Sequence, residues 1–130
     1  MLKRLDHLVL TTRDEVACVD FYTRILGMEL QTFGNNRKAF AYDEQKINVH
    51  VYGHEFEPKA HLPVPGSLDL CFIADIKLDE VIQHLQQLNY PIIEGPIQRT
   101  GALGPILSIY LRDPDLNLIE ISEPLYESDH

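Results

Sequence analysis

The chain has 130 residues, 45% hydrophobic and 24% charged, so a single folded domain is expected and disorder as the main state is excluded. Its 11 Lys and Arg against 20 Asp and Glu give a net charge of −9, which argues against a nucleic-acid partner. The N-terminal apolar stretch, broken by Asp6 and His7, is too short for a signal peptide or a membrane span. We therefore expect a cytoplasmic protein with no membrane partner.

The first half of the chain predicts a strand, a helix and three more strands. The first strand covers residues 5–11, and apolar residues at helix-face spacing follow over 13–26, ending before Gly27. Three further extended segments are expected at 28–33, 38–42 and 47–52. Residues 54–66 carry three prolines and predict a linker.

The second half repeats this plan. A strand is expected at 67–75, a helix at 78–88 and an extended segment at 91–93. A glycine-rich loop over 95–105 is expected to precede the last two strands, at 106–111 and 118–122. Cys18 and Cys71 lie within apolar segments and are interpreted as small core residues rather than a disulfide pair.

Fixed offsets support an internal duplication. An offset of 62 places His7 on Asp69, and an offset of 70 in the later part of each half places His50 on Glu120. The predicted fold class is therefore α+β. Two tandem βαβββ modules, at about 1–53 and 67–125, form a curved mixed sheet with the helices on its outer face.

Four residues that can bind a metal lie between apolar neighbours on the first and last strands of the modules. They are His7, His50, Asp69 and Glu120. Because successive side chains of a strand point to opposite faces, all four are expected to face away from the helices. Two imidazoles and two carboxylates suit one divalent ion of Zn, Ni, Mn, Fe or Co. The alternative from the residues alone is a solvated polar face.

The chain resembles the vicinal oxygen chelate superfamily, which includes glyoxalase I, the bleomycin-resistance proteins and the extradiol dioxygenases. The matching segments are LDHLVLTTRD at 5–14, VDFYTRILGMEL at 19–30, GSLDLCFIAD at 66–75 and RDPDLNLIEI at 112–121. The subgroup most similar is the glyoxalase domain-containing protein 5 subgroup, through KINVH at 46–50, EFEPKAHLP at 55–63 and GPIQRTGALGPI at 95–106.

This resemblance implies paired βαβββ modules that chelate one metal, and a homodimer with or without exchange of modules. His7 matches the first-strand ligand of the family and Glu120 the last-strand glutamate, whereas Asp69 stands where glyoxalase I usually has histidine. The fourth ligand is His50 by the internal repeat but Asn48 by the glyoxalase pattern. His50 is preferred because imidazole is the better ligand for these metals.

The resemblance also implies an activity. We expect a metal-dependent lyase or isomerase of the glyoxalase I type, acting on a small substrate through vicinal oxygens by a metal-stabilised enolate, with Glu120 as the base. Arg99, Tyr110 and Asn48 are expected to contact the substrate. A non-catalytic small-molecule-binding protein is the alternative. A dioxygenase with a His7, His50 and Glu120 triad is disfavoured because such enzymes usually have four modules.

Overall fold

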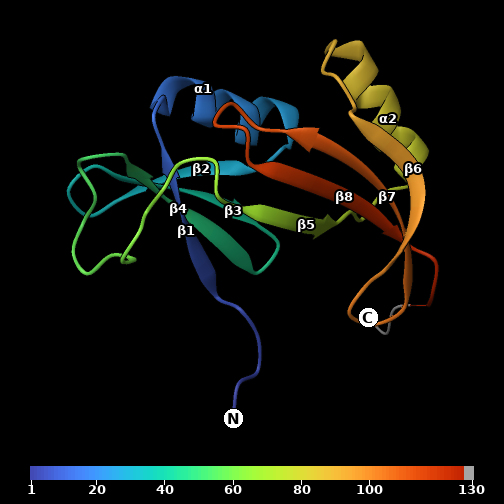
Figure 1. The fold of residues 1–130 in the computed structure, drawn as a ribbon, viewed down its shortest axis with the longest axis horizontal. Helices are drawn as coiled ribbons and strands as arrows, with labels where there is room; N and C mark the ends of the chain where they lie inside the picture. The colour runs from blue at the N-terminus through green and yellow to red at the C-terminus, as the bar shows by residue number, and fades with distance from the viewer. Residues whose placement is uncertain (128–130) are drawn as a thin grey trace. The chain divides into compact units, whose positions relative to one another are not determined.

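The fold consists of two modules with the same strand topology (Figure 1). A computed structural model describes residues 1–127 of the chain. Residues 1–68 with 114–116 make up the first compact unit, and residues 69–113 with the described residues from Asn117 onward make up the second. Each unit contains one four-stranded mixed sheet and helical structure, as the α+β prediction requires.

The first module has the sheet order β1-β4-β3-β2, with β1 parallel to β4 and the other pairs antiparallel. Its helix α1 begins where Asp14, at the N-cap, accepts a hydrogen bond from the backbone N–H of Ala17 at 3.1 Å. The helix continues into one π-helical turn, η1. The elements are β1 (His7–Thr12), α1 (Glu15–Asp20), η1 (Phe21–Ile25), β2 (Glu29–Phe33), β3 (Arg37–Tyr42) and β4 (Gln45–Val51).

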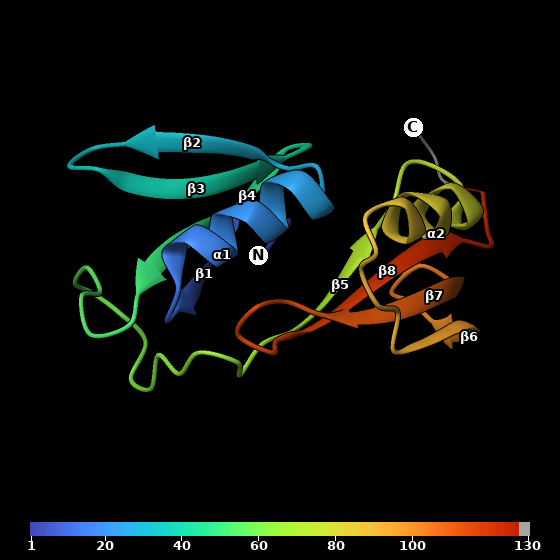
Figure 2. The ribbon, with the colours of Figure 1, turned by 90° about the horizontal axis from the view of Figure 1, so that it is seen from above.

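The second module repeats this topology with the order β5-β8-β7-β6, and β5 is parallel to β8. Its helix α2 lies against β8 (Figure 2). Glu123 accepts a hydrogen bond from the backbone N–H of Leu78 at 2.7 Å, which satisfies one free donor at the start of α2. The elements are β5 (Asp69–Ile73), α2 (Leu78–Gln87), β6 (Glu94–Thr100), β7 (Pro105–Arg112) and β8 (Leu118–Pro124).

The loop predicted at 95–105 is the main error in the expected elements. Residues 94–100 form strand β6, which pairs with β7 and contains an irregularity between Glu94 and Ile97. Gly95 lies at this irregularity with a φ of +102°, and a Cβ there would lie 2.4 Å from the carbonyl oxygen of Ser108. The glycine therefore marks a close backbone approach within a strand rather than a loop.

The core of each module lies on the side of its sheet that faces the helix. Leu10, Phe40 and Ile47 are fully buried in the first module, as are Ile109 and Ile119 in the second. Cys18 is fully buried, as expected.

The prediction for Cys71 was wrong, because its side chain is exposed. Its neighbours on β5, Leu70 and Phe72, are half-buried while Asp69 and Ile73 are exposed, so Cys71 belongs to the face that the core does not use.

Candidate functional site

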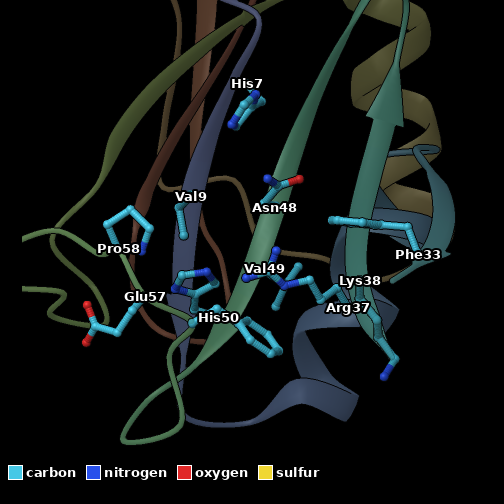
Figure 3. Close-up of a pocket in the computed structure, with 11 residues that line it drawn as sticks. His7, Val9, Phe33, Arg37, Lys38, Asn48, Val49, His50, Glu57 and Pro58 are labelled. Atoms are coloured by element: carbon cyan, nitrogen blue, oxygen red, sulfur yellow. The ribbon is translucent and has the colours of Figure 1, made fainter. Parts of the chain in front are cut away.

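One face of the first sheet gathers three of the predicted site residues. The register pairs Val9 with Asn48 and Thr11 with His50, so the side chains of His7, Asn48 and His50 share a face opposite the core. A pocket of about 200 Å³ opens on this face (Figure 3). Its lining consists of His7, Val9, Phe33, Arg37, Lys38, Asn48, Val49, His50, Phe56, Glu57 and Pro58.

His7 is oriented by its neighbour in the sequence. Its Nδ1 lies 2.9 Å from Oδ2 of Asp6, and its side chain is 44% exposed. The same hydrogen bond lowers the pKa of Asp6, so the carboxyl group stays ionised. With the ring proton on Nδ1 donated to this carboxylate, the lone pair of Nε2 is directed away from Asp6. A carboxylate behind the imidazole in this way is the usual support of a metal-binding histidine.

His50 lies deeper than His7, with only 9% of its surface exposed. Burial lowers its pKa, the guanidinium of Arg37 lowers it further, and Glu55 acts in the opposite direction. The ring meets that of Phe56 edge-on, with the centroids 5.6 Å apart. His50 is therefore a neutral imidazole at pH 7, available as a ligand or a hydrogen-bonding group.

Asn48 has an acceptor with no partner. Its Oδ1 is buried and makes no hydrogen bond, and no other buried side-chain nitrogen or oxygen within residues 1–127 is left in this state. A buried carbonyl oxygen without a donor is unfavourable, by about 1–3 kcal/mol. Because Asn48 lines the pocket, this oxygen is a candidate acceptor for a ligand or ion there.

The second module gathers the other predicted residues on the corresponding face. Cys71 of β5 and Tyr110 of β7 each pair with Glu120 on β8, and Asp69 begins β5 on the same face. Glu120 and Tyr110 are half-buried, whereas Asp69 is exposed. The sheet thus places one carboxylate beside a phenol and a thiol.

Arg99 lies on β6 rather than on the expected loop, and it contacts Tyr110. Its Nε donates a hydrogen bond to the Tyr110 hydroxyl at 3.0 Å, and its Nη2 lies 3.5 Å from Oε1 of Glu94. Because Tyr110 accepts from Arg99, its own O–H proton remains available to a third group. Arg99 and Tyr110 therefore form one polar unit next to Glu120.

Sequence reasoning missed a buried hydroxyl pair below Glu120. Ser108 and Ser122 are fully buried, with their Oγ atoms 2.7 Å apart. The Oγ of Ser122 also lies 3.4 Å from Sγ of Cys71 and 3.5 Å from Oε2 of Glu120. Ser108 and Ser122 pair across β7 and β8, on the sheet face opposite the helix. Strand alternation could have revealed them, because buried hydroxyl groups on one face need hydrogen-bond partners.

A family model describes nearly the whole chain. Residues 4–121 match the model of the Glyoxalase/Bleomycin resistance protein/Dioxygenase superfamily. The chain belongs to this superfamily. Members of the superfamily bind small molecules, which agrees with a pocket lined by polar side chains.

Two relatives are identical to this chain at about half of the aligned residues. Glyoxalase domain-containing protein RDO1 of Mycosarcoma maydis is 54% identical over 121 residues, which cover 93% of this chain and 68% of that protein. Virulence protein STM3117 of Salmonella typhimurium is 51% identical over 123 residues, covering 95% of this chain and 85% of that protein. The crystal structure of STM3117 matches with a TM-score of 0.94 and covers 96% of this chain and 99% of that chain.

A more distant match shows the fold alone. The crystal structure of lactoylglutathione lyase from Agrobacterium tumefaciens has a TM-score of 0.73 at 22% identity and covers 95% of each chain. Within residues 1–127, no helix is long and apolar enough to cross a membrane.

The strand registers of this chain correct the alignment of its two modules that was inferred from sequence offsets. Val9 and Cys71 each lie two residues beyond the first residue of their strand, and they pair with Asn48 and Glu120 respectively. Asn48 is therefore the counterpart of Glu120, and the sequence offset of 70 that matched His50 to Glu120 was wrong by two residues. The last hairpin turn also differs in length, since it comprises residues 43–44 in the first module and residues 113–117 in the second.

The residues present suit a divalent metal in their chemistry. No three His, Cys, Asp or Glu side chains within residues 1–127 group closely enough to hold a metal ion. Each module does, however, present possible ligands on one face: two imidazoles and an unpaired amide oxygen on the first, and two carboxylates on the second. Imidazole nitrogens together with amide and carboxylate oxygens are donors of the kind that first-row transition ions accept.

Proposed function

We propose that the chain is a metal-dependent lyase or isomerase of the glyoxalase type, acting on a small substrate that binds through vicinal oxygens. The buried, unpaired Oδ1 of Asn48 in the pocket of His7 and His50 carries this proposal. It is an acceptor that the fold of its own module leaves unsatisfied, and a cation or a substrate donor would satisfy it.

We propose His7, Asp69 and Glu120 as metal ligands, with the fourth from the first module. Both candidates for the fourth, His50 and Asn48, line the same pocket. The strand register and the unpaired oxygen now favour Asn48, and the neutral His50 would then hydrogen-bond the substrate. The chemistry that a Zn, Ni, Mn, Fe or Co ion supplies when bound is Lewis-acid polarisation of the substrate oxygens.

Glu120 is the proposed base. Its carboxylate is half-buried next to Tyr110, and a carboxylate removes a proton from a carbon beside a carbonyl when it is held within hydrogen-bond reach. Tyr110 keeps its hydroxyl proton to donate to a substrate oxygen, because its lone pair is used by Arg99. The same carboxyl group can return the proton to the neighbouring carbon, which completes an isomerisation. A homodimer is the assembly expected for this enzyme.

The reaction is tested with methylglyoxal and glutathione. Chelator-treated protein is expected to form no thioester product, and reloading with Zn, Ni, Mn, Fe or Co in turn is expected to restore turnover with at least one of them. His84→Ala, a change on the exposed surface of α2, is the matched control and should behave like the unaltered chain. Turnover that persists without metal, or no turnover with any of the five ions, would contradict this assignment.

A further inference from the structure

Arg37 is a cation in the pocket without an anionic partner. Its side chain is half-buried, and within residues 1–127 its guanidinium forms no ion pair. The neighbouring Lys38 differs, because its Nζ lies 2.8 Å from Oε1 of Glu15. In a chain of net charge −9, a partly buried guanidinium that has no carboxylate beside it is unusual.

The carboxylates closest in sequence to this part of the pocket have other partners. Glu57, which lines the pocket, is paired with Lys59, and Glu55 accepts a hydrogen bond from the backbone N–H of Gly53 at 2.9 Å. At His50, burial and Arg37 lower the pKa of the imidazole and Glu55 raises it. Arg37 is therefore a pocket cation that forms no ion pair within residues 1–127.

The guanidinium is held in a defined orientation. Its Cζ lies 4.1 Å from the centroid of the Phe56 ring, and the His50 ring meets the same Phe56 ring edge-on. Stacking on an aromatic ring uses the face of a guanidinium and leaves its in-plane N–H donors free. Two such donors in parallel match the two oxygens of a carboxylate or phosphate.

We propose that Arg37, stacked on Phe56, binds the anionic group of a small organic acid or phosphate ester in this pocket. The inference rests on the proposed function, since it names the substrate class of the same site. A cavity of ~150 Å³ is large enough for benzene, and this pocket is about 200 Å³ with Phe33, Val9 and Pro58 as apolar walls. The ligand is therefore an anion with a body of about one ring.

The test uses the metal-free chain of residues 1–130, labelled with ¹⁵N and titrated with benzoate, phenyl phosphate and the uncharged benzyl alcohol. Benzoate or phenyl phosphate should shift the Arg37 Nε–Hε signal and the amide signals of Asn48 and His50, and benzyl alcohol should not. Arg37→Gln should weaken binding of the anion by about tenfold or more, since charge-assisted, bidentate hydrogen bonds are lost. The anion that binds more tightly identifies a carboxylate or a phosphate as the natural group.

Arg13→Gln is the matched control, because Arg13 also stacks on an aromatic ring, with its Cζ 5.4 Å from the Tyr52 centroid, but does not line the pocket. It should bind the anion as the unaltered chain does. Equal binding by Arg37→Gln, or no shift with either anion, would overturn the inference. Metal content is measured in parallel: metal retained without anion binding refutes this inference alone, whereas anion binding by a chain that never takes up metal refutes the proposed function alone.

Discussion

Replacing Glu120 with glutamine is expected to lower turnover of methylglyoxal and glutathione by about 10²–10⁴-fold, the usual contribution of a positioned general base. The amide keeps the size of the side chain but cannot accept the substrate proton. Glu120 is half-buried and lies beside Tyr110. The Ser122 hydroxyl lies 3.5 Å from its Oε2 and can also donate to the oxygen of an amide. The fold should therefore be retained. Because Glu120 is also a proposed metal ligand, the loss is measured in a steady-state assay at a metal concentration that saturates the variant.

Glu44→Gln provides the comparison for this experiment. Glu44 is an exposed carboxylate at the turn between β3 and β4, 3.9 Å from Arg4, so its loss removes the same charge without touching the candidate site. It should leave turnover unchanged. If Glu120→Gln turns over as fast as Glu44→Gln, Glu120 is not the base.

Replacing Phe40 with alanine is expected to destabilise the chain by about 3–5 kcal/mol, the range for removing a buried aromatic side chain. Phe40 is fully buried on β3, and its ring stacks on that of Tyr22 with the centroids 5.0 Å apart and the planes at 15°. The change removes this contact and leaves a cavity below the helix. Denaturant unfolding followed by circular dichroism gives the free energy of unfolding.

Val16→Ala serves as the control for core packing. Val16 lies on α1 with 81% of its surface exposed, so its truncation should change the free energy of unfolding by no more than about 0.5 kcal/mol. A loss below about 1 kcal/mol for Phe40→Ala would show that this position is not part of the folded core.

The fold could be predicted from the sequence because both of its periodicities are clear. Alternation along 5–11 and the helical spacing over 13–26 gave β1 and the α1–η1 segment, and the same signals reappeared in the second half. Strand β6 was missed because Gly95 and Pro96 resemble a loop, while their effect here is a local irregularity in a paired strand. Cys71 was misassigned because an apolar run does not reveal which face of the sheet is covered.

The faces on which the candidate site residues lie could be predicted from the sequence, but the alignment of the two modules could not. Strand alternation correctly placed His7 and His50 on one face, and Tyr110 on the face of Glu120. The offset of 70 aligned His50 with Glu120, whereas the register aligns Asn48 with it, because a sequence offset does not reveal hydrogen-bond register. Which of the two residues is a ligand stays a prediction. The sequence did not single out Arg37. Its stacking on Phe56 and its lack of an ion pair within residues 1–127 are visible only in the structure.

Metal chelation by this chain is tested most directly by the metal content of the purified protein, measured by elemental mass spectrometry. We expect about one first-row metal ion per chain, as in a catalytic site with side-chain ligands and an open position. His7→Ala and Glu120→Gln should each lose most of this metal, Asn48→Ala should lose more than His50→Ala, and His84→Ala should retain it. A chain that takes up no Zn, Ni, Mn, Fe or Co, or His7→Ala and Glu120→Gln variants that hold as much metal as the unaltered chain, would contradict the account.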